Sequence, residues 1–140
     1  MNSNTKREIM LSHYQNPKNM EIPKSKKYLT FNTRNESCID NLDLYLQLNE
    51  DVITDIKFTG DACAIATSSA SIMSELLVGK NVDEALNVVM NFELMTKNKD
   101  YNTDLMKDAN AFDEIHKQPN RVLCACLAWN GIKKALEKKT

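Results

Sequence analysis

Leu42-Asp43-Leu44-Tyr45-Leu46-Gln47-Leu48 is the first of two stretches that decide the fold. The second follows after Asn49-Glu50-Asp51 and reads Val52-Ile53-Thr54-Asp55-Ile56-Lys57-Phe58. Leucine occupies every second position of the first stretch. In the second stretch the alternation continues through Val52, Thr54, Ile56 and Phe58. Strict period two is typical of a strand with one buried face. The polar residues between the stretches therefore predict an antiparallel hairpin with one face on a core.

One further strand pattern and several helical patterns flank this hairpin. Residues 4–15 predict a short helix that ends at Asn16-Pro17, and residues 27–33 predict a further strand. Residues 63–78 have apolar side chains at helical spacing, and their many Ala and Ser residues favour close packing on a neighbour, expected to be the sheet. Shorter helices are predicted from residue 81 or 82 to 89, at 92–97 and at 109–116, and a last helix begins near Pro119.

Length and charge limit the class of protein. A chain of 140 residues with 42% hydrophobic content predicts one domain, residues 1–140. The 18 basic and 19 acidic residues nearly cancel, so no nucleic-acid partner is expected. The sequence contains no membrane-spanning run, and Met1–Met10 does not resemble an export signal. We therefore expect a cytoplasmic protein whose thiols are reduced and serve metal binding or catalysis more often than disulfides.

The candidate site consists of Cys38, Asp40, Cys63 and Cys124. Three thiols and a carboxylate can supply the four ligands of a tetrahedral metal. Cys63 opens a predicted helix, where free backbone amides stabilise a thiolate, and Cys124 is expected in the first turn of the last helix. By spacing alone, these cysteines are equally well explained as unrelated small residues. Cys126 lies on the apolar stripe of the last helix and is expected in the core.

Four motifs carry a resemblance to a known family. In chain order they are residues 9–19 (IMLSHYQNPKN), 35–40 (NESCID), 58–66 (FTGDACAIA) and 121–129 (RVLCACLAW). Together they resemble the SufU/IscU-type iron–sulfur cluster assembly family over nearly the whole chain. The long segment between the second and third cysteine motifs resembles the SufU branch, as does Leu123, where IscU-type scaffolds carry histidine. Both histidines, His13 and His116, are expected to be structural or surface groups.

The resemblance implies an α+β fold, a three-stranded antiparallel sheet packed with helices, and a zinc ion held by Cys38, Asp40, Cys63 and Cys124. It also implies two kinds of partner: a pyridoxal-phosphate-dependent cysteine desulfurase, and downstream iron–sulfur assembly or acceptor proteins. The expected function is zinc-dependent sulfur relay by a sulfurtransferase-like carrier, with Cys38 as the nucleophile that accepts persulfide sulfur. Arg121 either supports the anionic site by hydrogen bonding or is a surface residue.

Two alternatives remain open from the sequence. Cysteine thiolates also suit iron, so the same residues can serve a scaffold that assembles and transfers a transient [2Fe-2S] cluster. In the other alternative the zinc is purely structural.

Overall fold

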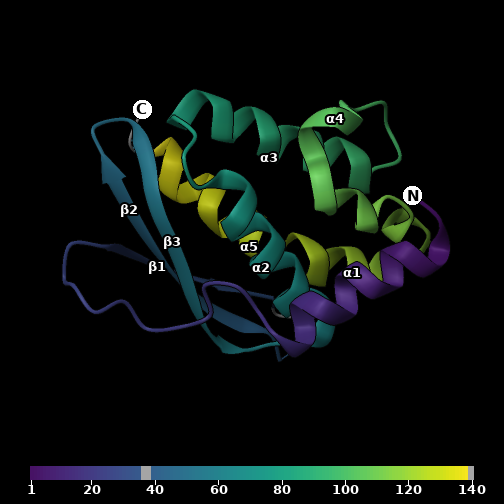
Figure 1. Ribbon diagram of the computed structural model, residues 1–140, viewed down its shortest axis with the longest axis horizontal. Helices are drawn as coiled ribbons and strands as arrows, with labels where there is room; N and C mark the ends of the chain where they lie inside the picture. Colours follow the sequence, from purple (N-terminus) through teal and green to yellow (C-terminus); the bar gives the residue numbers. More distant parts are fainter. Residues whose placement is uncertain (36–38, 139–140) are drawn as a thin grey trace.

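The computed structural model describes residues 1–35 and 39–138. In chain order its elements are α1 (Ser3–Gln15), β1 (Leu29–Arg34), β2 (Asn41–Asn49), β3 (Val52–Asp61), α2 (Ala64–Leu77), α3 (Val82–Thr96), α4 (Thr103–Met106), the 3-10 segments η1 (Lys107–Phe112) and η2 (Ile115–Lys117), and α5 (Pro119–Glu137). The helices gather on one side of the sheet (Figure 1). The expected α+β fold is confirmed. No helix of the described part of the chain is long and apolar enough to cross a membrane.

The sheet is antiparallel with the strand order β1-β2-β3. Leu44 pairs with Phe31 on one side and with Phe58 on the other. Leu42, Leu44 and Leu46 are fully buried beneath the helices, with α5 packed on β1 and β2 and α2 packed on β3. The predicted hairpin and its buried leucine face are therefore confirmed.

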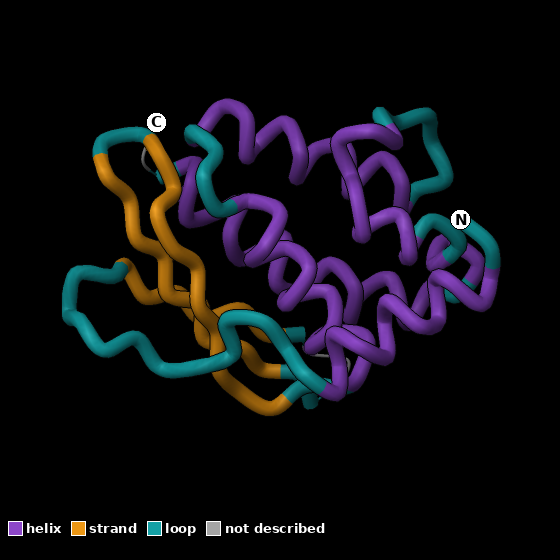
Figure 2. The backbone as a smooth tube through the Cα atoms, in the orientation of Figure 1, coloured by secondary structure: helices purple, strands orange, loops and turns teal. Residues whose placement is uncertain are grey.

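The opposite face of the sheet is covered in part by the loop between α1 and β1, drawn in teal in Figure 2. The hydroxyl of Tyr28 donates a hydrogen bond to Asp55, and the Lys57 ammonium lies 2.9 Å from a Glu21 carboxylate oxygen. The sheet thus has one apolar face on the core and one polar face under a loop.

The predicted alternation is wrong at the start of β3. Val52 and Thr54 are exposed there, whereas Ile53 is fully buried. The register of β2 against β3 shifts between Gln47 and Leu48, which leaves Thr54 as an extra residue in β3. Such a bulge reverses the phase of the side chains that precede it, because successive strand residues point to opposite faces.

The helix predictions hold for α1, α2 and α5, which begins at Pro119 as expected. The predicted helices ending at residue 89 and spanning residues 92–97 form one helix, α3. Asn81 and Glu84 close a capping box at its start, with each side chain accepting a hydrogen bond from the other residue's backbone N–H. Residues 109–116, predicted to be helical, are divided instead between two short 3-10 segments and the turn that joins them.

α2 packs on α5 and α1 more than on the sheet, which corrects the sequence expectation. His13 Nδ1 lies 2.7 Å from Ser71 Oγ, and Asn19 Nδ2 donates to Ser74 Oγ at 2.9 Å. The backbone N–H of Lys18 also donates to Ser71 Oγ. Serine hydroxyls on α2 thus hold the motif at residues 9–19 in place, and His13 is largely buried between α1 and α2.

Substituting Gly131 with alanine is expected to destabilise the fold. A Cβ at Gly131 would lie 2.6 Å from Leu44 Cδ1 and 2.9 Å from Thr33 Cβ, because α5 crosses the sheet closely at this point. In a helix alanine is about 1 kcal/mol more favourable than glycine, but overpacking a core lowers the stability of the fold by about 1–3 kcal/mol. We expect urea denaturation to give a lower free energy of unfolding for Gly131→Ala. Asn130→Ala, at an exposed position of the same helix, is the control, and a Gly131→Ala protein as stable as this control would contradict the prediction.

Candidate metal centre

The register of the sheet brings Asp40 next to Cys63. Asp40 directly precedes β2, whose first residue, Asn41, pairs with Asp61 near the end of β3. Gly60 has φ +134°, and a Cβ there would lie 2.2 Å from the Asn41 carbonyl oxygen. A glycine at this point lets the two strands approach closely, so the chain after β3 reaches Cys63 while still beside Asp40.

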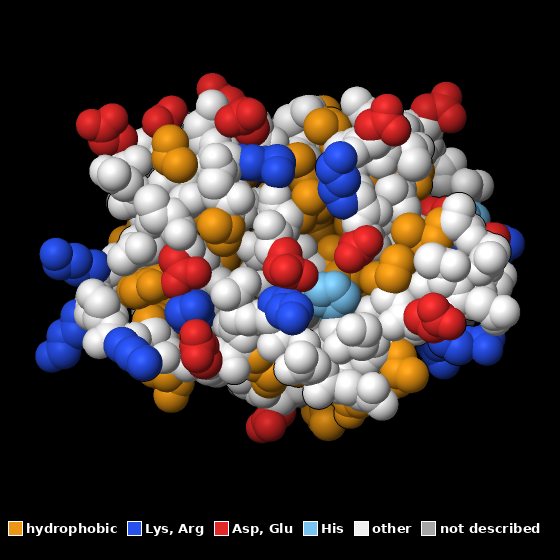
Figure 3. Space-filling view, in the orientation of Figure 1, with side chains coloured by type: hydrophobic (Ala, Val, Ile, Leu, Met, Phe, Trp, Pro, Cys, Tyr) orange, Lys and Arg blue, Asp and Glu red, His pale blue; other side chains and the backbone are white. Residues whose placement is uncertain are grey.

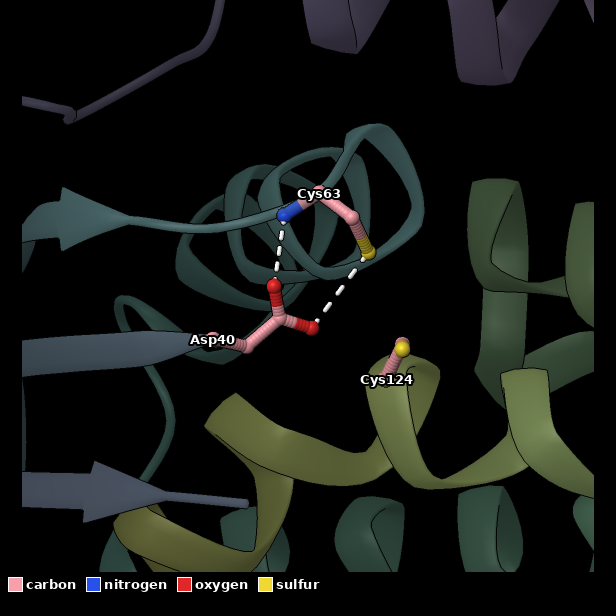
Figure 4. A group of neighbouring side chains, drawn as sticks. All are labelled: Asp40, Cys63 and Cys124. Carbon is pink, nitrogen blue, oxygen red and sulfur yellow. Dashed lines mark hydrogen bonds between the residues drawn. The ribbon is translucent and has the colours of Figure 1, made fainter. Parts of the chain in front are cut away.

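Two hydrogen bonds join these residues (Figure 4). Asp40 is 2% exposed, and its Oδ1 accepts the backbone N–H of Cys63 at 2.7 Å. The Cys63 thiol lies 3.4 Å from Asp40 Oδ2, to which it donates. Cys63 is also the N-cap of α2, where its sulfur accepts from the Ala66 N–H at 3.4 Å. The prediction that Cys63 opens a helix is confirmed, and the sulfur and the carboxylate are held side by side.

Cys124 approaches the same point from α5. It lies in the second turn of this helix, so the expected first-turn position is wrong. Asp40, Cys63 and Cys124 each offer one ligand atom, and these three atoms all lie within 4.8 Å of one another. The structure therefore brings together three of the four predicted ligands. Cys38 lies outside the described residues.

The charges at this point disfavour a bare thiolate on Cys124. Burial raises the pKa of the Cys124 thiol, and the neighbouring Asp40 and Cys63 raise this pKa further. A cation bound among these side chains would reverse these effects on Cys124 and favour its thiolate form. Two sulfurs and one carboxylate oxygen form a donor set that suits zinc and other thiophilic metals.

Ser69 and Trp129 fix α2 against α5 and thereby hold the two cysteine-bearing helices in register. Ser69 Oγ donates to the Ala125 carbonyl at 2.6 Å, next to Cys124 in sequence, and accepts from Trp129 Nε1 at 2.9 Å. This role of Ser69 and Trp129 was not predicted from the sequence. The only signal was the serine-rich character of α2, because the partners lie 56 and 60 residues away.

The other residues singled out from the sequence take different positions around this cluster. Cys126 is half-buried against the core, and burial raises the pKa of its thiol, as expected for a packing residue. Arg121 is exposed, and among the described residues no hydrogen bond or ion pair joins it to the metal centre, so its supporting role stays a prediction. Leu123, at the position where IscU-type scaffolds carry histidine, is 47% exposed beside Cys124.

Comparison with known proteins identifies the family. A family model described as the NifU-like N-terminal domain matches residues 5–139. This chain belongs to that family. Within the NifU-like family, it is 31% identical over 134 residues to the zinc-dependent sulfurtransferase SufU of Bacillus subtilis (strain 168), covering 95% of this chain and 90% of the relative. It is 35% identical over 105 residues to the iron–sulfur cluster assembly scaffold protein IscU of Thermotoga maritima, covering 75% of this chain and 74% of the relative.

Solved structures agree with this assignment. A candidate SUF-system assembly scaffold from Fervidobacterium islandicum AW-1 superposes with a TM-score of 0.85 at 31% identity, covering 92% of this chain and 94% of that chain. The N-terminal part of a NifU-like protein from Brucella abortus gives a TM-score of 0.83 at 18% identity, which supports the fold alone; it covers 99% of this chain and 100% of that chain. The predicted SufU/IscU-type membership is confirmed, and this NifU-like domain belongs among iron–sulfur cluster assembly proteins.

Proposed function

We propose that this NifU-like domain is a zinc-dependent sulfur acceptor that takes persulfide sulfur from a cysteine desulfurase and passes it to iron–sulfur cluster assembly. The observation that carries the proposal is the convergence of Asp40, Cys63 and Cys124 within 4.8 Å. The B. subtilis relative named as a zinc-dependent sulfurtransferase supports the same function.

The ligands of the proposed site are Cys38, Asp40, Cys63 and Cys124. Zinc bound there would keep thiolates deprotonated at neutral pH without redox chemistry of its own. Two hydrogen bonds between Asp40 and Cys63 hold these two proposed ligands side by side within the protein itself. Cys38 precedes Asp40 by two residues in the sequence and completes the set.

Cys38 is the proposed sulfur acceptor. Its thiolate attacks the outer sulfur of the desulfurase persulfide, and a new sulfur–sulfur bond forms on Cys38. The sulfur–sulfur bond of the donor breaks, and its electron pair remains on the desulfurase cysteine as a thiolate. One sulfur atom moves between two cysteines with no net oxidation or reduction, so no further oxidant or reductant is needed.

Cys38→Ala tests this role. After incubation with desulfurase and L-cysteine, mass spectrometry is expected to show one added sulfur atom on the unsubstituted protein and almost none on Cys38→Ala. Cys126→Ala serves as the control, since Cys126 is a core thiol away from the proposed ligand set. Circular dichroism of each variant separates loss of sulfur transfer from loss of folding. Sulfur uptake by Cys38→Ala equal to that of the control would reject Cys38 as the acceptor.

A second candidate function is a scaffold that assembles a [2Fe-2S] cluster on the same side chains. The IscU scaffold of T. maritima, at 35% identity, favours it. Leu123 favours the sulfur acceptor, because the residue directly before Cys124 in the sequence is not a histidine. Anaerobic reconstitution followed by cluster transfer to an apo-protein decides between the two: efficient transfer that zinc inhibits would support the scaffold.

A further inference from the structure

A histidine and two carboxylates, side chains of the types that ligate metals, lie away from the cysteines at a pocket between α1, α2 and η1. The pocket has a volume of about 220 Å³ and is lined by His13, Ile72, Glu75, Leu76, Lys107 and Asp108. On the face drawn in Figure 3, a histidine lies among charged side chains at the rim of a hollow with hydrophobic walls. Since each water occupies about 30 Å³ in the liquid, the pocket has room for an ion and several waters.

The imidazole of His13 is the fixed part of this group. His13 is 8% exposed, and Ser71 Oγ holds its Nδ1 at 2.7 Å on the inner side. Its Nε2 points the other way, 3.7 Å from Glu75 Oε1 and 3.9 Å from Asp108 Oδ2. These distances exceed a hydrogen bond, and within the described residues Nε2 has no hydrogen-bond partner. The accessible ring nitrogen of a largely buried histidine thus faces the pocket between two carboxylates.

We propose that His13 Nε2, Glu75 and Asp108 bind a divalent transition-metal ion that links α1, α2 and η1. One imidazole nitrogen and two carboxylate oxygens are a donor set for borderline ions such as manganese(II), iron(II) and zinc(II). When Nδ1 carries the proton and donates to Ser71 Oγ, Nε2 keeps its lone pair for the metal, the arrangement usual for metal-bound histidines.

The charges around the pocket favour a cation. The two carboxylates belong to exposed side chains, with 49% exposure for Glu75 and 60% for Asp108, so both can turn toward Nε2. Lys107 also lines the pocket and opposes the cation, but its single positive charge leaves the two carboxylates and the neutral imidazole with a net charge of −1. The site shares no residue with the cysteine centre, so its existence does not depend on the proposed sulfur transfer.

Manganese(II) is a suitable probe, because it prefers oxygen and nitrogen ligands to thiolates and broadens nearby proton resonances. In a titration of the full chain followed by NMR, the His13 ring resonances are expected to broaden first, well before those of His116. Glu75→Gln and Asp108→Asn are each expected to weaken this manganese binding about tenfold or more, since even outer-shell changes cost 10–100-fold. Glu8→Gln, at an exposed position of α1 outside the pocket, is the matched control and should leave the titration unchanged.

The possible results distinguish a specific manganese site from nonspecific attraction of the ion to acidic surface groups. Equal broadening of His13 and His116 would overturn the proposal. So would unchanged broadening of His13 in the Glu75→Gln/Asp108→Asn double variant. Both substituted carboxylates are exposed, so these variants are expected to fold, and amide spectra taken before manganese is added verify this.

Discussion

Cys124→Ser is expected to weaken zinc binding by roughly a hundredfold to a thousandfold. The Cys124 sulfur lies within 4.8 Å of ligand atoms of Asp40 and Cys63, and serine replaces a soft thiolate with a hydroxyl that stays protonated. Structural zinc sites contribute about 10–16 kcal/mol, so one of four ligands accounts for about 2.5–4 kcal/mol if the ligands share equally. Competition with a chromophoric zinc chelator measures the loss.

The chain provides its own matched control two residues away. Cys126 lies on the same helix, but its thiol packs against the core and donates toward Thr96 Oγ1 at 3.7 Å. Burial raises the pKa of this thiol, which keeps it a neutral packing group. Cys126→Ser should therefore retain one zinc per chain with unchanged affinity. Equal affinity loss in the two variants, or none in Cys124→Ser, would contradict the assigned ligand set.

Trp129→Ala is expected to cost about 3–5 kcal/mol of unfolding free energy, the usual range for removing a buried large aromatic side chain. Trp129 is 1% exposed and stacks on Phe92 with ring centroids 4.1 Å apart and planes 6° apart. The substitution also removes the donor to Ser69, the residue that ties α2 to α5 beside Cys124. For a chain of this size the loss corresponds to a melting temperature lower by about 10–20 °C.

Trp129→Phe separates the two contributions of this side chain. Phenylalanine keeps a ring against Phe92 but cannot donate to Ser69, so we expect a smaller loss, of about 1–3 kcal/mol. Chemical denaturation followed by far-ultraviolet circular dichroism gives both values. If Trp129→Ala unfolded with nearly the wild-type free energy, the role of Trp129 as the central packing residue between α3, α2 and α5 would be wrong.

Local patterns in the sequence were enough for most of the fold. The alternation in residues 42–48 fixed a strand with one buried face, and the helical row in residues 63–78 fixed α2 with Cys63 at its start. These predictions held because the period of a strand or helix, and the cap of a helix, depend on residues close together in the chain. Prediction failed at Thr54, where the bulge depends on how β2 pairs with β3, and at α3, where packing joined two short patterns into one helix.

For the candidate metal centre, the sequence by itself determined the candidate donors and the helix start that holds Cys63. Only the tertiary structure decided that Asp40, Cys63 and Cys124 meet, since their approach depends on the close strand pairing at Gly60 and on the contact of Ser69 with α5. Both contacts join segments far apart in the chain. Their energies depend on packing between those segments, and no local period or spacing encodes that packing.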